Sequence, residues 1–186
     1  MNALIDRLPT AVEIDGTLYA LNSDFRVALK IMQAFEDPEL MWFEKQAIMI
    51  DLLYSEVPPN VEKACELAVR FLNCDEYAKV DSNQKRIFSF NKDSKYIFSG
   101  MYQTHGVDLE SVEYMHWWKF CYLFYDLRDD CFFNRIRYFR QQKNKGKLTK
   151  EEAAYCREIQ DVLELPQTDY SDEYYATDLM EYINGS

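Results

Sequence analysis

The residues with the greatest potential for chemistry lie in one string of eight, EYMHWWKF, from Glu113 to Phe120. Glu113 and His116 have the E-x-x-H spacing that supplies one half of a carboxylate di-iron site in a helix bundle. Such a site needs a second E-x-x-H pair, but the only other histidine, His105, has Tyr102 three residues before it. The sequence therefore does not complete a di-iron site.

Other catalytic or metal-binding patterns are missing from the sequence. No two of the five cysteines lie two to four residues apart and the two histidines form no H-x(3–5)-H pair, so we expect no zinc site. The chain has no glycine-rich phosphate loop, no G-x-S-x-G string and no H-E-x-x-H string. A Cys–His dyad stays open, because one sequence does not show which side chains meet in space. We expect no metal, no cofactor, no enzymatic activity, and reduced cysteines.

The same string can instead form the inside of the protein. On a helix predicted over about 109–126, five side chains share one side by the i, i+3, i+4, i+7 rule. They are Tyr114, Trp117, Trp118, Cys121 and Tyr125. Residues 120–125, FCYLFY, contain no charged side chain, which is typical of a buried helix. We therefore predict that the five residues belong to the core and that His116 is a partly buried histidine with a structural hydrogen bond.

A mainly helical fold must position these residues. Gly and Pro number only 5 each in 186 residues, which disfavours a turn-rich all-β fold. The one strong turn signal is Asp15-Gly16, because a type I′ turn needs positive φ at both central positions. We predict a β-hairpin over residues 12–20, with strands Val12–Ile14 and Leu18–Ala20. It belongs to a single mainly α domain over residues 1–165, with about six or seven helices.

Apolar residues at spacings of three and four predict where the helices lie. The expected ranges are about 22–35, 38–53, 61–71, 92–104, 109–126, 131–141 and 150–165. The second of these helices would open at Asp37-Pro38 and bury Leu40, Phe43, Ala47, Ile50 and Leu53 on one face.

Local signals mark several helix ends. Thr149 and Glu152 form a T-x-x-E capping box, and Gly106 is suited to the position after a helix end. Pro166 ends the last predicted helix. Residues 74–86 lose the helical period and are expected to form a connecting loop.

The net charge of −11 is unevenly distributed along the chain. Residues 1–83 carry 15 acids and 7 bases, residues 135–150 carry 7 bases and no acid, and residues 151–186 carry 10 acids and 1 base. An acidic protein repels phosphates, so we expect no binding to nucleic acid. The basic block 135–150 is either a phosphate-binding patch or, as we favour, a solvated or internally neutralised stretch. With no apolar run of 18 residues and no secretory signal, we expect no membrane partner.

The C-terminal residues 166–186 form an acidic tail with five acids and no Lys or Arg. On a helix, Tyr175, Leu179, Tyr182 and Ile183 would share one face, which is common in segments that dock on a partner. We predict that these four residues bind a partner. A frayed, solvated terminus and a fold-back onto residues 135–150 remain alternatives.

Several strings resemble a family of phage and prophage proteins from Gram-positive hosts. EYMHWWKF resembles the double-Trp signature of that family, LPTAVEIDGTLYALNSDFRVAL resembles its opening, and LLYSEVPPNVEKA resembles its Leu-Tyr-x-x-x-x-Pro segment. The resemblance covers roughly residues 4–165. By its usual place in phage genomes, the family is similar to the tail-assembly chaperones of long-tailed phages.

The resemblance implies a non-enzymatic assembly factor in the cytoplasm of the bacterial host. Its partners would be the tape-measure protein and tail-tube subunits, and a homo-oligomer is compatible with such a role. The family has no catalytic residues to carry over. The alternative function is an acidic phage-encoded inhibitor that mimics DNA and blocks a host nucleic-acid enzyme. The basic block 135–150 argues against it, because a mimic should present one sign of charge.

Overall fold

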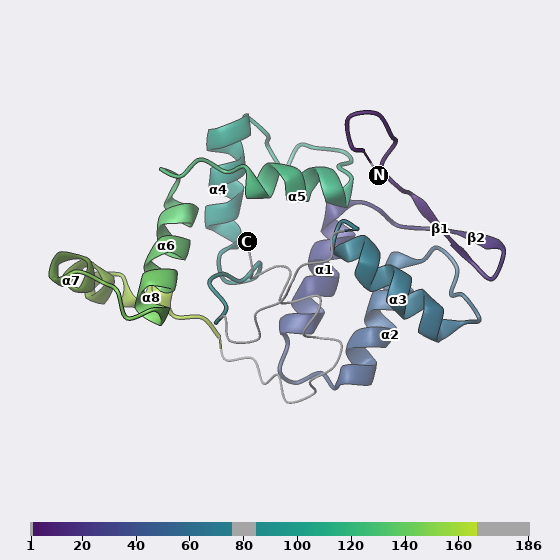
Figure 1. Ribbon diagram of the computed structural model, residues 1–186, viewed down its shortest axis with the longest axis horizontal. Helices are drawn as coiled ribbons and strands as arrows, with labels where there is room; N and C mark the ends of the chain where they lie inside the picture. Colours follow the sequence, from purple (N-terminus) through teal and green to yellow (C-terminus); the bar gives the residue numbers. More distant parts are fainter. Residues whose placement is uncertain (1, 76–84, 167–186) are drawn as a thin grey trace.

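Figure 1 shows the computed structural model of the chain, which describes residues 2–75 and 85–166. A two-stranded antiparallel hairpin is followed by eight helices in these residues. The elements are β1 Ala11–Ile14, β2 Thr17–Ala20, α1 Phe25–Glu36, α2 Trp42–Leu53, α3 Val61–Leu72, α4 Ser94–His105, α5 Trp117–Tyr125, α6 Phe132–Asn144, α7 Lys150–Glu158 and α8 Gln160–Leu163. The predicted fold class, a single mainly helical domain with an N-terminal hairpin, is confirmed.

The hairpin forms where its turn residues predict it. Asp15 and Gly16 have φ values of 49° and 79°, the left-handed region that a type I′ turn requires. Ile14 pairs with Thr17 across the turn, and its side chain is only 2% exposed. β1 contacts α3, so a ribbon that would be marginal alone is supported by a helix.

Helix ends defined by local side-chain chemistry match the prediction. The Thr149 hydroxyl accepts from the Glu152 amide while the Glu152 carboxylate accepts from the Thr149 amide, which completes the capping box of α7. Gly106 ends α4 with a φ of 67°. The predicted last helix divides at Ile159, where the backbone has φ −108° and ψ 25°, so the described residues form eight helices where about six or seven were predicted.

The predicted start of α2 is wrong. Met41, and not Asp37, is its N-cap, and the Glu44 carboxylate accepts from the Met41 amide at 2.8 Å. The Asp37 carboxylate instead accepts from the Glu39 amide at 2.9 Å. Asp37 therefore closes a turn that contains Pro38, and the helix begins after this turn.

The predicted helix over 109–126 begins only at Trp117. Residues 115–117 pair with the backbone that leads into α1: Phe25 donates to the Met115 carbonyl at 2.9 Å, and Trp117 donates to the Ser23 carbonyl at 2.8 Å. An isolated antiparallel bridge joins Asp24 to His116. This non-local pairing occupies backbone groups that a longer helix would need, so α5 starts after it.

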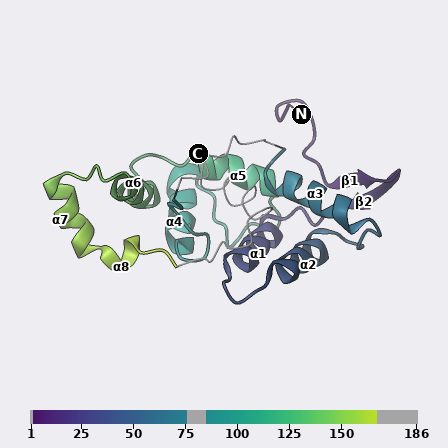
Figure 2. The ribbon, with the colours of Figure 1, turned by 60° about the horizontal axis from the view of Figure 1, so that its bottom comes forward.

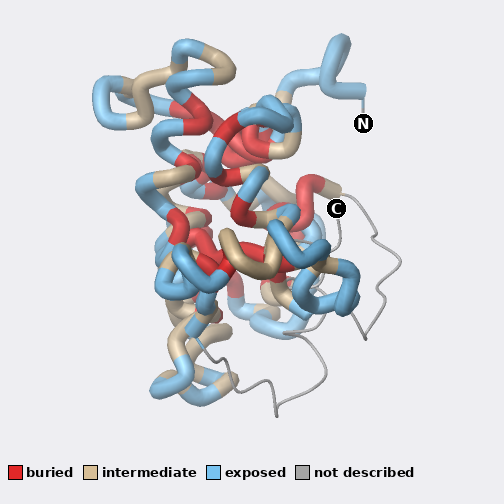
Figure 3. Tube along the Cα trace, turned by 90° about the vertical axis from the view of Figure 1, so that its left-hand side faces the viewer, coloured by how far each residue is buried: buried red, intermediate tan, exposed pale blue. Residues whose placement is uncertain are grey.

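The helices pack around one main core. α1 contacts α2 and α5, α2 contacts α3, and α4 contacts α5 and α6, an arrangement that can be followed in Figures 1 and 2. Figure 3 shows the buried residues along the inside of the trace and exposed residues on its outer turns. A second, smaller cluster of Ile136, Cys156 and Leu163 joins α6 to α7 and α8. α7 lies at one end of the molecule and the hairpin at the other.

Candidate protein-binding site

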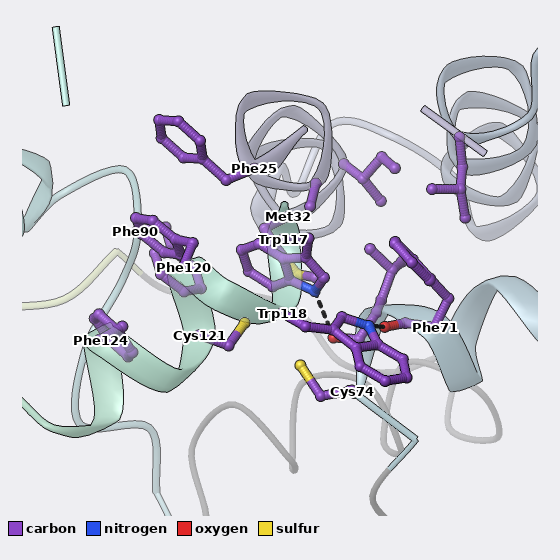
Figure 4. Packing of buried hydrophobic residues seen from close by; sticks show 14 of the residues in the cluster. Phe25, Met32, Phe71, Cys74, Phe90, Trp117, Trp118, Phe120, Cys121 and Phe124 are labelled. Atoms are coloured by element: carbon purple, nitrogen blue, oxygen red, sulfur yellow. Dashed lines mark hydrogen bonds between the residues drawn. The ribbon is translucent and has the colours of Figure 1, made fainter. Parts of the chain in front are cut away.

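The two tryptophans of the EYMHWWKF string donate hydrogen bonds to carbonyls at the C-terminal end of α3. Trp117 and Trp118 are 1% and 3% exposed. The Trp117 indole N–H donates to the Leu72 carbonyl at 2.8 Å, and the Trp118 indole N–H donates to the Phe71 carbonyl at 2.7 Å (Figure 4). The last carbonyls of a helix have no partner within the helix. The adjacent tryptophans therefore fill the core and satisfy the end of a neighbouring helix at the same time.

The structure places the other predicted core residues of this string differently. Cys121 is buried, and Tyr125 is half-buried against the core. The prediction that Tyr114 belongs to the core is wrong, because its side chain is 55% exposed. Tyr114 precedes the true start of α5 and so does not share the helix face, and its hydroxyl hydrogen-bonds the Ser23 hydroxyl at 2.8 Å.

His116 uses both ring nitrogens for structural hydrogen bonds. Nδ1 accepts from the Trp118 amide at 3.0 Å and caps α5, while Nε2 lies 2.9 Å from the Pro9 carbonyl, to which it donates. Burial lowers the pKa of His116, and the bond to Pro9 opposes that shift only in part. The imidazole is therefore neutral with both nitrogens engaged, whereas Glu113 lies exposed on the surface. This geometry does not suit a general base or a metal ligand.

Two of the cysteines lie in surroundings that disfavour a nucleophilic thiolate. Burial raises the pKa of the Cys65 and Cys156 thiols, which opposes the thiolate that a Cys–His dyad needs. All five cysteines are free. Within residues 2–75 and 85–166, no group of three or more His, Cys, Asp or Glu side chains is arranged to hold a metal ion. In the same ranges, no helix has the length and apolar character that crossing a bilayer requires.

The basic block 135–150 divides into a buried and an exposed part. Arg140 is 3% exposed and pairs with Asp93, which is 0% exposed, at 2.5 and 3.0 Å. The expectation of neutralisation holds for this arginine, but its partner is 47 residues distant rather than in a flanking acidic segment. The lysines of the block are exposed at the end of α6 and the start of α7: Lys143, Lys145, Lys147 and Lys150.

An apolar groove on the outer side of α2 and α3 is the strongest candidate for a binding site. Its cavity volume is about 610 Å³. The apolar residues that line it are Phe43, Ala47, Ile48, Ile50, Val57 and Val61. Phe43 is 64% exposed, and Val57 and Val61 are each 53% exposed. Clustered exposed apolar side chains of this kind mark interaction surfaces more often than isolated ones do.

The groove exists because α2 is apolar on more than one side. Met49, Ile50 and Leu53 face the core, whereas Phe43 and Ala47 face solvent. The prediction that Phe43 and Ala47 share the buried face is therefore wrong. The signal was present in the helix sequence WFEKQAIMIDLL, which has more apolar residues than one buried face can hold.

A larger cavity of about 1020 Å³ lies beside α5 and α6. Its lining has both signs of charge, from Asp126, Asp129, Arg135 and Arg137. It also includes Cys74 and Ile87, which flank the undescribed residues 76–84. We assign no ligand to it.

Comparison with known protein families gives a match over most of the chain. A profile of the family described as "Bacteriophage Gp15 protein" matches residues 4–165. The chain belongs to the bacteriophage Gp15 family. No curated protein and no solved structure matches it. The resemblance to a phage protein family is thus confirmed at the level of the family.

The tail of this Gp15-family chain lies beyond the family match. The four residues predicted to bind a partner, Tyr175, Leu179, Tyr182 and Ile183, lie outside the described residues. Their role therefore stays a prediction. Among the residues that are described, the α2–α3 groove is the site that sequence reasoning missed.

Proposed function

We propose that this Gp15-family protein is a non-enzymatic factor of phage tail morphogenesis. In this proposal it is a tail-assembly chaperone that acts in the host cytoplasm on the tape-measure protein or on tail-tube subunits. Membership of a phage protein family supports a role in the phage. The observation that carries the proposal is the exposed apolar surface of Phe43, Val57 and Val61, because a chaperone of apolar helices needs such a surface.

The hydrogen bonds and the ion pair of the buried polar side chains favour a binding role over a catalytic role. Both nitrogens of His116 hold the backbone, and Arg140 and Asp93 neutralise each other in the interior. An active site usually keeps a titratable group poised toward a pocket. His116, Arg140 and Asp93 instead serve the packing of the helices, while the groove is lined mainly by apolar side chains.

Co-expression with the tape-measure protein of the same phage tests the proposal. The tagged protein should increase the soluble yield of the tape-measure protein and retain it, or the tail-tube protein, in a pull-down. The matched control is the major capsid protein of that phage, which should not be retained. If neither tail protein is retained, the proposal is overturned. Inhibition of a host nuclease by the pure protein would favour the DNA-mimic alternative.

A further inference from the structure

The acidic rim of the α2–α3 groove is defined by Asp51, which lines it, and by Glu56 and Glu62, the exposed sequence neighbours of the lining residues Val57 and Val61. Asp51 lies one helical turn after Ala47. Residues 39–62 carry five acids and a single base. An apolar floor with an acidic rim selects for both shape and charge.

The few bases near the groove are engaged elsewhere. The single base of residues 39–62 is Lys45, and its ammonium donates to the Phe35 carbonyl of α1 at 3.1 Å. Lys63, which follows Glu62, pairs with Glu66 at 2.7 Å. Lys45 keeps its charge in this hydrogen bond, but five acids against one base still leave residues 39–62 with a net charge of −4.

We propose that the α2–α3 groove binds an amphipathic helix whose apolar face is flanked by Lys or Arg. The inference rests on the proposed function, in which the partner presents apolar helices. Phe43, Ala47 and Asp51 follow one another at i, i+4 and i+8, so the small Ala47 leaves room for an apolar anchor between an aromatic ring and a carboxylate. Anchors at i, i+3, i+4 and i+7 of the partner match a groove of this kind.

The negative charge of the rim makes the chain's own acidic tail an unfavourable occupant of the groove. Residues 166–186 carry five acids and no Lys or Arg. Placing these acids beside Asp51, Glu56 and Glu62 would bring like charges together, which costs binding energy. A partner with bases beside its apolar face gains from the same rim.

Two designed peptides test the proposal with the full-length protein. Both are 18-residue helices with one leucine face, flanked by Lys in the first peptide and by Glu in the second. Fluorescence anisotropy should show the Lys-flanked peptide binding at least about tenfold more tightly at low salt, and added salt should reduce this preference. Equal affinity of the two peptides would overturn the proposal.

Substitutions in the protein test whether the peptide binds in the groove. Phe43→Ser should weaken binding of the Lys-flanked peptide at least about tenfold, because the aromatic side chain of the groove lining is removed. Tyr102→Ser on α4 is the matched control, since Tyr102 is 61% exposed and Phe43 is 64% exposed. The double variant Asp51→Lys with Glu62→Lys should bind the Glu-flanked peptide more tightly than the Lys-flanked one. Circular dichroism verifies that each variant is folded. If Phe43→Ser behaves as Tyr102→Ser does, the groove is not the binding site.

The proposed function can fail separately from this inference. The tape-measure pull-down with the unsubstituted protein tests the proposed function. If it retains the tape-measure protein and Phe43→Ser retains it equally well, the function stands and the groove assignment falls. If the Lys-flanked peptide binds the groove but neither tail protein is retained, the function falls and the groove keeps its specificity.

Discussion

Replacement of Arg140 by Met removes a buried side chain with five hydrogen bonds while keeping much of its volume. The guanidinium uses all five of its N–H donors. Two go to the Asp93 carboxylate at 2.5 and 3.0 Å. The other three go to the carbonyls of Ile87 at 3.1 Å, Val162 at 2.7 Å and Leu163 at 2.9 Å. One side chain thus ties α6 to the segment before α4 and to α8.

The cost follows from what Arg140→Met leaves behind. Asp93 is 0% exposed, so its carboxylate would remain in the interior without its counter-charge. Breaking a buried ion pair by removing one partner costs about 3–5 kcal/mol. Three carbonyls lose their donor as well, and we therefore expect the loss to lie at the upper end, at about 5 kcal/mol. Domains of ordinary stability have about 5–15 kcal/mol in total, so the variant should be close to unfolding.

Urea denaturation followed by circular dichroism measures this loss. Lys143→Met is the matched control, because Lys143 is exposed on the same helix, and it should change the free energy of unfolding by less than about 0.5 kcal/mol. Asp93→Asn removes the stranded charge, so the double variant with Arg140→Met should lose less than the sum of the two single losses. A loss of under about 1 kcal/mol for Arg140→Met would refute the reasoning, because the Arg140–Asp93 ion pair would then contribute little more stability than a Met side chain packed in the same place.

Four further predictions concern the α5 start, the hairpin and the tail. Trp117→Phe should cost about 1–3 kcal/mol in urea titrations, because the buried Leu72 carbonyl loses its indole donor, and Trp118→Phe should cost less, because the Phe71 carbonyl also accepts from the Cys74 amide at 3.0 Å; Ala at either position should cost about 3–5 kcal/mol. Because burial lowers the pKa of His116, the unfolded chain takes up the proton first as the pH falls below about 6.5, so the free energy of unfolding should fall from there down to the lowered pKa. His116→Asn should lack this step while keeping a capping oxygen, and an unchanged pH profile would contradict the role of His116. Gly16→Ala should lower the melting temperature by a few degrees, since φ is 79° there, and no change would show that the turn bears no strain. Truncation after Leu165 should keep the melting temperature within a few degrees but lose partner binding, and unfolding of the shortened protein would place the tail in the core.

The candidate site can be predicted from the sequence only in part. The apolar excess of α2 was visible in WFEKQAIMIDLL, but its outward face depends on how the helix rotates between α1 and α3. Phe43 and Ile50 share the expected spacing, yet Ile50 is buried and Phe43 is exposed. Periodicity gives the direction in which the side chains point but not how much of the helix its neighbours cover, so Phe43, in the first turn of α2, stays exposed while Ile50 is buried.

The sequence by itself determined the features whose chemistry is local. Asp15-Gly16 set the hairpin turn through left-handed backbone angles, and Thr149 with Glu152 set the start of α7 through hydrogen bonds within one turn. Each of these depends on residues at most three positions apart, so its signal can be read from one short string of the sequence.

Only the tertiary structure decided the features that depend on distant partners. α5 begins at Trp117 because residues 115–117 pair with the backbone before α1, and that pairing outweighs a helical pattern that extends further back. Arg140 is buried because Asp93 and three carbonyls from other segments meet its donors, although its own stretch reads as a solvated basic block. A buried charge is stable only where its partners converge in space, and that convergence is a property of the packed helices rather than of any one segment.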